Sequence, residues 1–278
     1  MAQHKDKVAL VTGASAGIGL ATGKALAAAG WAVVGASRRG AAPPGCEAIV
    51  MDVDDDRSVA EGVASALERH GHIDALVACA GWGLGGPVET TPVADAKAQV
   101  ETNFWGAVRA AQAVLPGMRA QHAGRIVFIS SIGGVIALPF QGFYSASKFA
   151  LEGLAEAMAY EVEPFGVKVT LVQPGNVRTE FTEKRRLAPA PGSPVGSDGP
   201  GDDPYAAALT KAIGTMGKDE QNGVAADDVA KVVLRVLESS RPRRRVSVGK
   251  AWERAGLVAK RALPFALFQA AAKGDLGV

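Results

Sequence analysis

The chain has 278 residues, 48% of them hydrophobic and 21% charged, which is enough apolar material for one large domain or two small ones. A formal net charge of +2 offers no strong attraction to nucleic acid, so we expect no nucleic-acid partner. The two cysteines, Cys46 and Cys79, supply neither a disulfide framework nor a metal-ligand set, and we expect no metal. The N-terminus lacks the apolar core of a signal peptide, and no apolar run approaches ~18 residues, so we expect a cytoplasmic protein with no membrane span.

Short apolar runs alternate with helical patterns along most of the chain. In chain order, strands are expected at Val8–Val11, Trp31–Ser37, Glu47–Met51, Ile73–Ala78, Arg125–Ser130, Lys168–Gln173 and Arg245–Val248. Helices are expected after the first strand as far as about Ala29, then at Arg57–His70, Val93–Leu115 and Tyr144–Val162. Strands rich in β-branched residues that alternate with helices are typical of a parallel sheet covered on both faces. The sequence therefore predicts an α/β fold, a doubly wound parallel sheet in a single domain of residues 1–278.

Residues 179–223 break this alternation. They include two stretches of turn and linker residues, Pro189–Pro194 and Gly196–Pro204. A connection of this length usually marks a domain boundary or a mobile functional segment. Only one helix, one strand and a terminal tail follow it, so we interpret residues 179–223 as a lid-like loop over a substrate site.

Residues 250–278 are expected to form a helical tail. Its apolar stretch, Ala262–Ala272, is compatible with a cover over a substrate site, a subunit contact or contact with a membrane surface. The stretch lacks the strongly basic face that an interfacial anchor prefers. We therefore expect the tail to pack against the domain.

A glycine-rich segment, Thr12–Gly19, separates the first strand from the first helix. Its glycines stand at Gly13, Gly17 and Gly19, in the pattern Gly-x-x-x-Gly-x-Gly. Glycine allows a tight turn, close approach of a pyrophosphate to the backbone and close packing of the helix on the strand. The N-terminus of the following helix offers free N–H groups and a positive dipole end to phosphates. The segment therefore predicts a dinucleotide site in a Rossmann-type fold.

The end of the second strand indicates which dinucleotide is bound. An acidic residue about 20 positions after the glycines would bind the adenosine ribose and favour NAD. The segment instead reads Ala36-Ser37-Arg38-Arg39 and contains no carboxylate. The Ser37 hydroxyl and the Arg38 guanidinium suit a 2′-phosphate, so NADP(H) is favoured over NAD(H).

Tyr144 and Lys148 stand four residues apart in an expected helix, so they share one helix face. A lysine cation within a few ångströms would stabilise the phenolate and lower the tyrosine pKa from its usual ~10. Tyr144 is then a candidate proton donor or acceptor near neutral pH. Such a pair is common on ordinary helix surfaces, but here Ser131 precedes Tyr144 by 13 residues and a phosphate-binding segment precedes both.

Together these residues make the chain resemble the short-chain dehydrogenase/reductase family, in its single-domain branch with a Tyr-x-x-x-Lys motif. The resemblance covers about Lys7 to Thr182 and is less specific beyond. Scaffold residues around Leu138–Phe140, Tyr144–Gly153 and Pro164–Val167 are similar to those of the 17β-hydroxysteroid and retinol dehydrogenase branch.

The resemblance implies an oxidoreductase that transfers a hydride between a nicotinamide and a carbonyl or secondary alcohol. Its implied catalytic residues are Asn103, Ser131, Tyr144 and Lys148. Ser131 and Tyr144 would bind and protonate the carbonyl oxygen, Lys148 would hold the nicotinamide ribose, and Asn103 would organise a water path. The implied cofactor-binding residues are Gly13, Ser15, Gly17, Ile18, Gly19, Ser37, Arg38, Asp52, Val53, Ala80, Gly81, Asn103, Tyr144, Lys148, Pro174, Gly175, Val177 and Thr179.

One segment departs from the family pattern. Ala78-Cys79-Ala80-Gly81 stands where the family has Asn-Asn-Ala-Gly after the fourth strand. The backbone role of Ala80 and Gly81 is kept, while the missing asparagines bear on the local rigidity of the sheet.

The substrate is expected to be a small lipophilic ketone or a hydroxysteroid-like compound. Apolar residues near the Ser–Tyr pair, with lid and tail residues, are expected to line its pocket; they are Val135, Leu138, Phe140 and Phe143. The helices Val93–Leu115 and Tyr144–Val162 pack between subunits in the family, so the resemblance also implies a homodimer or homotetramer.

Two alternatives remain open. A catalytically silent dinucleotide-binding regulatory protein would share the fold but would not need Ser131 and Tyr144 together. An enzyme of epimerisation or dehydration would share it too, although such relatives usually carry a larger C-terminal substrate domain.

Overall fold

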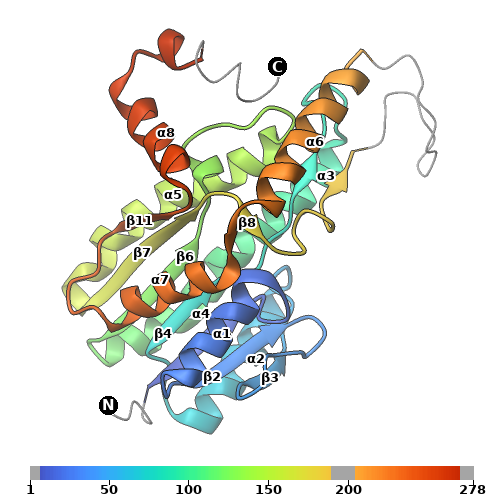
Figure 1. Ribbon diagram of the computed structural model, residues 1–278. Helices are drawn as coiled ribbons and strands as arrows, with labels where there is room; N and C mark the ends of the chain where they lie inside the picture. The colour runs from blue at the N-terminus through green and yellow to red at the C-terminus, as the bar shows by residue number, and fades with distance from the viewer. Residues whose placement is uncertain (1–6, 189–203, 270–278) are drawn as a thin grey trace.

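The computed structural model describes residues 7–188 and 204–269 of the chain. Its main sheet has seven strands in the order β11-β7-β6-β4-β1-β2-β3, and all neighbouring strands are parallel. Helices cover both faces of the sheet (Figure 1). The predicted doubly wound parallel sheet is confirmed.

The strands lie within two residues of the predicted apolar runs at either end. They are β1 (Val8–Thr12), β2 (Ala32–Ser37), β3 (Glu47–Val50), β4 (Ala75–Ala78), β6 (Gly124–Ile129), β7 (Val167–Pro174) and β11 (Arg245–Val248). Every residue of β1 and β4 is buried, because central strands of a doubly wound sheet are covered on both faces.

Two apolar layers hold the helices against the sheet. One layer contains Leu10 of β1 and lies under α2 (Asp56–His70), α4 (Gly106–Ala120) and α5 (Gly142–Val162). The other contains Val11 and lies under α1 (Gly17–Ala28) and α7 (Ala226–Glu238). Leu10 and Val11 enter opposite layers because successive residues of a strand face opposite sides.

The helix expected over Val93–Leu115 is divided by a π-helical turn. α3 (Val93–Val100) runs into this turn at Glu101–Trp105, and α4 then continues to Ala120. The turn is a local widening of the i→i+4 ladder, and such turns occur frequently at functional sites. Asn103 stands in its middle and is buried.

The interpretation of residues 179–223 as a loop is wrong in part, because α6 occupies Ala206–Gln221. Its apolar residues follow the helical spacing i, i+3, i+4, i+7. They are Leu209, Ala212, Ile213 and Met216. The proline and glycine stretches that suggested a loop fall in residues 189–204, almost all of which lie outside the described residues.

Short strands fasten the segment on either side of these residues. β8 (Val177–Arg178) pairs with β10 (Val224–Ala225), and β9 (Arg186–Leu187) pairs with β5 (Leu84–Gly85). The segment is therefore tied to the body at both ends. Its action as a lid stays a prediction.

The tail begins with α8 (Ala251–Ala262). Beyond it, Leu263, Phe265 and Leu267 are exposed by 43%, 62% and 60%, so the expectation that the tail packs against the domain is wrong for these residues. Residues 270–278 lie outside the described residues. Within the described ranges, no helix combines the length and the apolar character that crossing a bilayer requires.

The strand order reverses between β1 and β4, because β2 and β3 extend the sheet on one side and β6, β7 and β11 on the other. In doubly wound sheets, ligands bind outside the carboxyl ends of the strands at such a switch point. A cavity of about 1480 Å³ lies there, lined by residues that follow β1, β2, β3, β4, β6 and β7 and by residues of α6 and α8.

Candidate active site

The end of β1 and the loop that follows it contact the loop after β4. The Thr12 hydroxyl accepts hydrogen bonds from the N–H groups of Cys79 (3.0 Å) and Ala80 (3.2 Å). Gly13 has a φ of +68°, and a Cβ there would lie 2.9 Å from the Cα of Ala80, so only glycine fits. The loop after β4 contributes only backbone groups to this junction, so the junction does not depend on the asparagines that Ala78 and Cys79 replace.

The N-terminus of α1 opens onto the cavity through Ala16, Gly17 and Ile18. No side chain caps this terminus, and its first turn holds no acidic residue, so its N–H groups and positive dipole end face the cavity. Gly17 has a φ of +51°. Gly19 instead allows α1 to pack closely against the Gly13 backbone, because a Cβ at residue 19 would lie 2.3 Å from the Gly13 carbonyl oxygen. These features fit the phosphates of a dinucleotide.

The polar groups after β2 lie at one end of the cavity. Arg38 and Arg39 are exposed and line it. The Arg39 guanidinium donates a hydrogen bond of 3.4 Å to the hydroxyl of Ser15, which belongs to the glycine loop. The buried Ser37 hydroxyl donates to the Ala41 carbonyl (2.8 Å) and accepts from the Ala41 N–H (2.9 Å), so it also shapes the turn.

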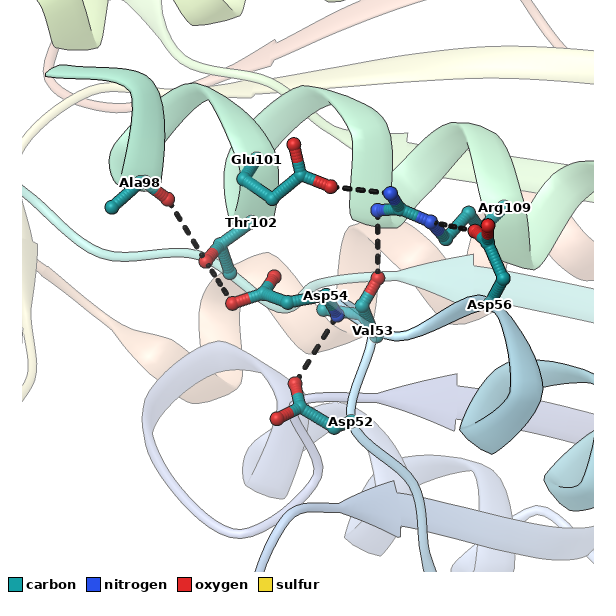
Figure 2. Close-up of polar contacts among 8 residues, drawn as sticks. All are labelled: Asp52, Val53, Asp54, Asp56, Ala98, Glu101, Thr102 and Arg109. Atoms are coloured by element: carbon teal, nitrogen blue, oxygen red, sulfur yellow. Dashed lines mark hydrogen bonds and ion pairs between the residues drawn. The ribbon is translucent and has the colours of Figure 1, made fainter. Parts of the chain in front are cut away.

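Asp52 and Val53 line the cavity next to this end, in the turn after β3. The Asp54 N–H donates to the Asp52 carboxylate at 3.1 Å, as Figure 2 shows. The Thr102 hydroxyl, from the π-helical turn, donates to Asp54 at 2.9 Å. Burial raises the pKa of the Asp54 carboxyl, and the hydrogen bond from Thr102 opposes that shift.

Arg109 of α4 fastens the same turn from the other side. Its guanidinium donates to the Val53 carbonyl at 3.2 Å and forms ion pairs with Asp56 and Glu101 (Figure 2). The turn that would contact the adenine is therefore attached to both halves of the long helix around Asn103.

Ser131, Tyr144 and Lys148 lie together at the other end of the cavity, and all three line it. The Ser131 and Tyr144 side chains both flank Gly133, because a Cβ there would lie 3.3 Å from Ser131 Oγ and 3.2 Å from a ring carbon of Tyr144. The Ser131 hydroxyl accepts the Gly133 N–H at 3.0 Å. Lys148 Nζ donates to the Ile129 carbonyl at 2.9 Å and lies 6.0 Å from the centroid of the Tyr144 ring. The spacing of these residues in the sequence does bring their side chains together.

The charge states of this group differ from the expectation. Burial raises the pKa of Tyr144, with the hydrogen bond from Ser131 and the charge of Arg185 lowering it and Glu220 raising it. Burial also lowers the pKa of Lys148 to about 8. The predicted lowering of the tyrosine pKa is wrong here, because desolvation is the largest effect on Tyr144 and the cation that lowers its pKa is Arg185, not Lys148.

Asn103 does not line the cavity but stands directly behind its wall. Its side-chain oxygen accepts the Trp82 N–H at 2.9 Å, and its amide donates to the Trp82 carbonyl (3.0 Å) and to Ser147 (3.3 Å). A Cβ at Gly81 would lie 3.0 Å from the Asn103 oxygen and 3.8 Å from Lys148 Nζ. Asn103 thus fixes the loop after β4 next to Lys148.

The loop after β7 completes the predicted cofactor wall with Pro174, Gly175, Val177 and Thr179, all of which line the cavity. Glu253 of α8 holds this loop, because its carboxylate accepts the Asn176 N–H at 2.7 Å and the Lys250 N–H at 2.5 Å. Of the predicted cofactor residues, Gly19 and Asn103 alone lie outside the lining.

Most of the residues predicted for the substrate wall lie outside the cavity lining, and their contact with a substrate stays a prediction. Leu138 lines the cavity, whereas Val135, Phe140 and Phe143 do not. Phe143 precedes Tyr144 on α5 and therefore points about 100° away around the helix. Phe140 has a φ of +57° and packs against Tyr205, with 6.5 Å between ring centroids.

Other large apolar residues line the cavity. They are Trp82, Ile132, Ile136, Phe181, Met216, Trp252, Leu263 and Phe268. Phe181 lies edge-on to the Tyr144 ring, with 5.8 Å between centroids. The helical spacing of Met216 with Ile213 was the signal for the α6 contribution, while nothing in the sequence placed Trp252 here.

A doubly wound sheet with a glycine cradle and an uncapped helix terminus at its switch point is typical of dinucleotide-binding α/β proteins. Comparison with known proteins narrows this class. The family model described as short chain dehydrogenase matches residues 7–190. The chain belongs to this family of oxidoreductases, which act on alcohols and carbonyls.

The chain is also similar to individual proteins of this family. The chain is 38% identical over 246 residues to a 3-ketodihydrosphingosine reductase of Bacteroides thetaiotaomicron, a match that covers 88% of each chain. It is 40% identical over 194 residues to the mouse 17-beta-hydroxysteroid dehydrogenase type 1, covering 64% of this chain and 56% of the relative. A solved short-chain dehydrogenase from Streptomyces avermitilis has a TM-score of 0.76 and 31% identity, covering 96% of this chain and 97% of the other.

Proposed function

We propose that the protein is an NADP(H)-dependent reductase of lipophilic ketones, acting reversibly on the corresponding secondary alcohols. The observation that carries this proposal is the convergence of Ser131, Tyr144 and Lys148 on one cavity, which the glycine cradle also lines. A protein that only bound a dinucleotide would have no use for two hydroxyls converging in an apolar chamber.

Ser131 and Tyr144 would donate hydrogen bonds to the carbonyl oxygen and stabilise the negative charge that develops on it. Tyr144 would then give its proton to that oxygen. A raised pKa suits this role, because the phenol stays protonated at neutral pH until the oxygen becomes basic. The fixed positions of both hydroxyls reduce the reorganisation needed in the reaction.

The cofactor would be held along the whole cavity. The Gly13–Gly17 loop and the N-terminus of α1 would bind its phosphates, Arg38 and Arg39 its 2′-phosphate, and Lys148 its nicotinamide ribose. When bound, the nicotinamide supplies the hydride that reduces the carbonyl carbon. The loop of Pro174 to Thr179, fixed through Glu253, would set the orientation of the nicotinamide.

The wall around Tyr144 supports a lipophilic substrate. Ile136, Phe181, Met216 and Trp252 add apolar surface to the cavity that Ser131 and Tyr144 line, and Phe181 packs against the Tyr144 ring. A volume of about 1480 Å³ exceeds the roughly 300–1,000 Å³ of ordinary ligand pockets, which leaves room for a substrate beside a dinucleotide. The relatives named for a ketosphingoid lipid and for a steroid favour the same class.

The test is turnover of NADPH with a panel of ketones that includes a long-chain 3-ketone and a 17-ketosteroid, followed by nicotinamide absorbance. Tyr144→Phe should lower kcat by at least about 10²-fold, the usual contribution of a positioned acid, with little change in NADPH affinity. Wild-type kcat in this variant would refute the role of Tyr144. Tight NADPH binding without turnover of any ketone or alcohol would favour the silent binding protein.

A further inference from the structure

The chain from Lys250 to Gln269 forms an exposed apolar element, which we call the C-terminal element. In Figure 1 its helix α8, drawn in red, projects from the body of the molecule. Its exposed large apolar side chains are Trp252 (54%), Val258 (66%), Leu263 (43%), Phe265 (62%) and Leu267 (60%). Single exposed apolar residues are ordinary, but five on one short element, two of which also line the cavity, leave enough apolar surface to favour a partner.

The exposed charge of the C-terminal element is entirely positive. It carries four cationic residues, which are Lys250, Arg254, Lys260 and Arg261, and one acidic residue, Glu253. Glu253 is only 2% exposed, and both of its oxygens accept backbone N–H groups. Arg254 and Arg261 are seven residues apart, so they lie two turns apart on one side of α8.

Cations and apolar side chains are interleaved in this element. Lys260 Nζ lies 4.5 Å from the centroid of the Phe265 ring and 4.9 Å from that of Phe268. A long lysine stem of this kind covers apolar surface while its ammonium reaches the polar side. The apolar stretch Ala262–Ala272 lacks a basic face of its own, and the cations of α8 supply one next to it.

We propose that the C-terminal element binds the surface of a bilayer that contains anionic lipids. Such a surface offers negative headgroups to Arg254 and Arg261 and apolar depth to Val258 and Phe265, which is what interfacial helices require. A second copy of the same face fits less well, because symmetric pairing would bring like charges together. The 12 residues of α8 are too few to span a bilayer, so the helix lies on it.

The C-terminal element is also a wall of the active-site cavity. Trp252, Gly256 and Ala259 of α8, with Leu263 and Phe268 beyond it, line the cavity that holds Tyr144. Binding to a bilayer would therefore bring this cavity next to the lipid phase, from which a lipophilic ketone can enter. This second consequence depends on the proposed function, whereas bilayer binding does not.

Flotation of the full chain with vesicles tests the binding. The wild type should float with vesicles of 30% phosphatidylglycerol in phosphatidylcholine, and much less with pure phosphatidylcholine or in 0.5 M NaCl. The double variant Arg254→Glu/Arg261→Glu should bind at least about 25-fold more weakly, since each cation near an anionic surface contributes about fivefold or more. Val258→Glu should weaken binding at least about tenfold.

Matched controls separate the face from general effects of charge. Val93 is exposed by 66%, as Val258 is, and stands on α3, so Val93→Glu should bind like the wild type. Arg119→Glu/Lys168→Glu makes the same change in net charge at two exposed residues elsewhere. The proposal is refuted if the wild type does not bind anionic vesicles, or if the Arg254/Arg261 variant binds them as tightly as this control. It is also refuted if Val258→Glu binds vesicles like the wild type and instead halves the molecular mass of the protein in solution, because the face would then be a dimer contact.

An activity measurement then tests the second consequence. With a long-chain ketone embedded in anionic vesicles, Arg254→Glu/Arg261→Glu should lower kcat/KM at least about tenfold, whereas with a water-soluble ketone it should match the wild type. Equal activity on both would overturn substrate delivery from the bilayer. Failure of every ketone would instead overturn the proposed function, and flotation would still decide whether the element binds lipid.

Discussion

Lys148 Nζ lies 6.0 Å from the centroid of the Tyr144 ring and donates its hydrogen bond to the Ile129 carbonyl, at 2.9 Å. Both side chains are buried, at 6% and 9% exposure. The lysine is therefore held by the end of β6 in a site where its own charge is costly, and this cost lowers its pKa to about 8. The site keeps a destabilising ammonium at neutral pH, as functional sites often do.

Lys148→Met is expected to raise the free energy of unfolding at pH 7. Below pH 8 the Lys148 ammonium is charged in both the native and the unfolded protein. In the native protein its burial costs up to about 3 kcal/mol, and the hydrogen bond to the Ile129 carbonyl reduces this cost. Between pH 8 and 10.5 the native lysine loses its proton first and the cost disappears, so the advantage of the variant should shrink over this window.

Urea unfolding at pH 7 and at pH 10 measures this difference. The exposed Lys168 on β7 provides the control, because Lys168→Met should change the free energy of unfolding only slightly, and by the same amount at pH 7 and pH 10. A stabilisation by Lys148→Met that is the same at pH 7 and pH 10 would contradict the lowered pKa.

Arg38→Asp is expected to lower the ratio of kcat/KM for NADPH to that for NADH by at least about tenfold, because one charged hydrogen bond contributes about 1.5–3 kcal/mol. Arg39→Asp should act in the same direction and should also release the Ser15 hydroxyl from its 3.4 Å contact. Initial rates with both cofactors measure the ratio. Arg57→Asp, at an exposed side chain on α2, is the control, and an unchanged ratio in both test variants would place the 2′-phosphate elsewhere.

The sheet and the proximity of Tyr144 to Lys148 could be predicted because both depend on local patterns. Buried parallel strands need unbroken apolar runs, and Tyr144 and Lys148 share a face through the helix period alone. The π-helical turn at Asn103 could not be predicted, since the apolar period on either side of it hardly changes. The pKa of Tyr144 depends on burial by residues distant in the chain, which no local pattern records.

The apolar part of the cavity wall was the least predictable part. α6 and α8 contribute to it, and they reach the cavity only through the tertiary fold. The spacing of Ile213 and Met216 does indicate α6, but the prolines that end at residue 204 conceal this signal because they favour a loop. The exposure of Phe265 could not be found, because an apolar stretch has the same sequence whether it packs or stays exposed.

Glu253→Ala is expected to destabilise the protein by about 1–3 kcal/mol, because it leaves the Asn176 and Lys250 N–H groups without their acceptor. It should also weaken NADPH binding, since the loop from Pro174 to Thr179 loses its support. Chemical unfolding and a fluorescence titration with NADPH measure the two effects. The neighbouring exposed residue gives the control, because Arg254→Ala should leave both values near those of the wild type.

Arg185 and Glu220 form a buried ion pair between the turn before β9 and α6, with side chains exposed by 2% and 13%. Their charges act on Tyr144 in opposite directions: Arg185 lowers its pKa and Glu220 raises it. A reductase that needs the protonated phenol loses activity as the pH rises through this pKa. Arg185→Met should therefore move the basic limb of the pH–kcat profile for ketone reduction to higher pH, and Glu220→Gln should move it to lower pH.

The two variants should also lose stability, because each leaves one buried partner of the pair alone, at a cost of about 3–5 kcal/mol. The double variant Arg185→Met/Glu220→Gln removes both charges and should recover part of this loss of stability. The basic limb of its pH–kcat profile should lie between those of the two single variants. Glu183→Gln, at an exposed residue of the same turn, should leave the profile unchanged. Shifts of both single variants in one direction would show that the profile does not report the charge around Tyr144.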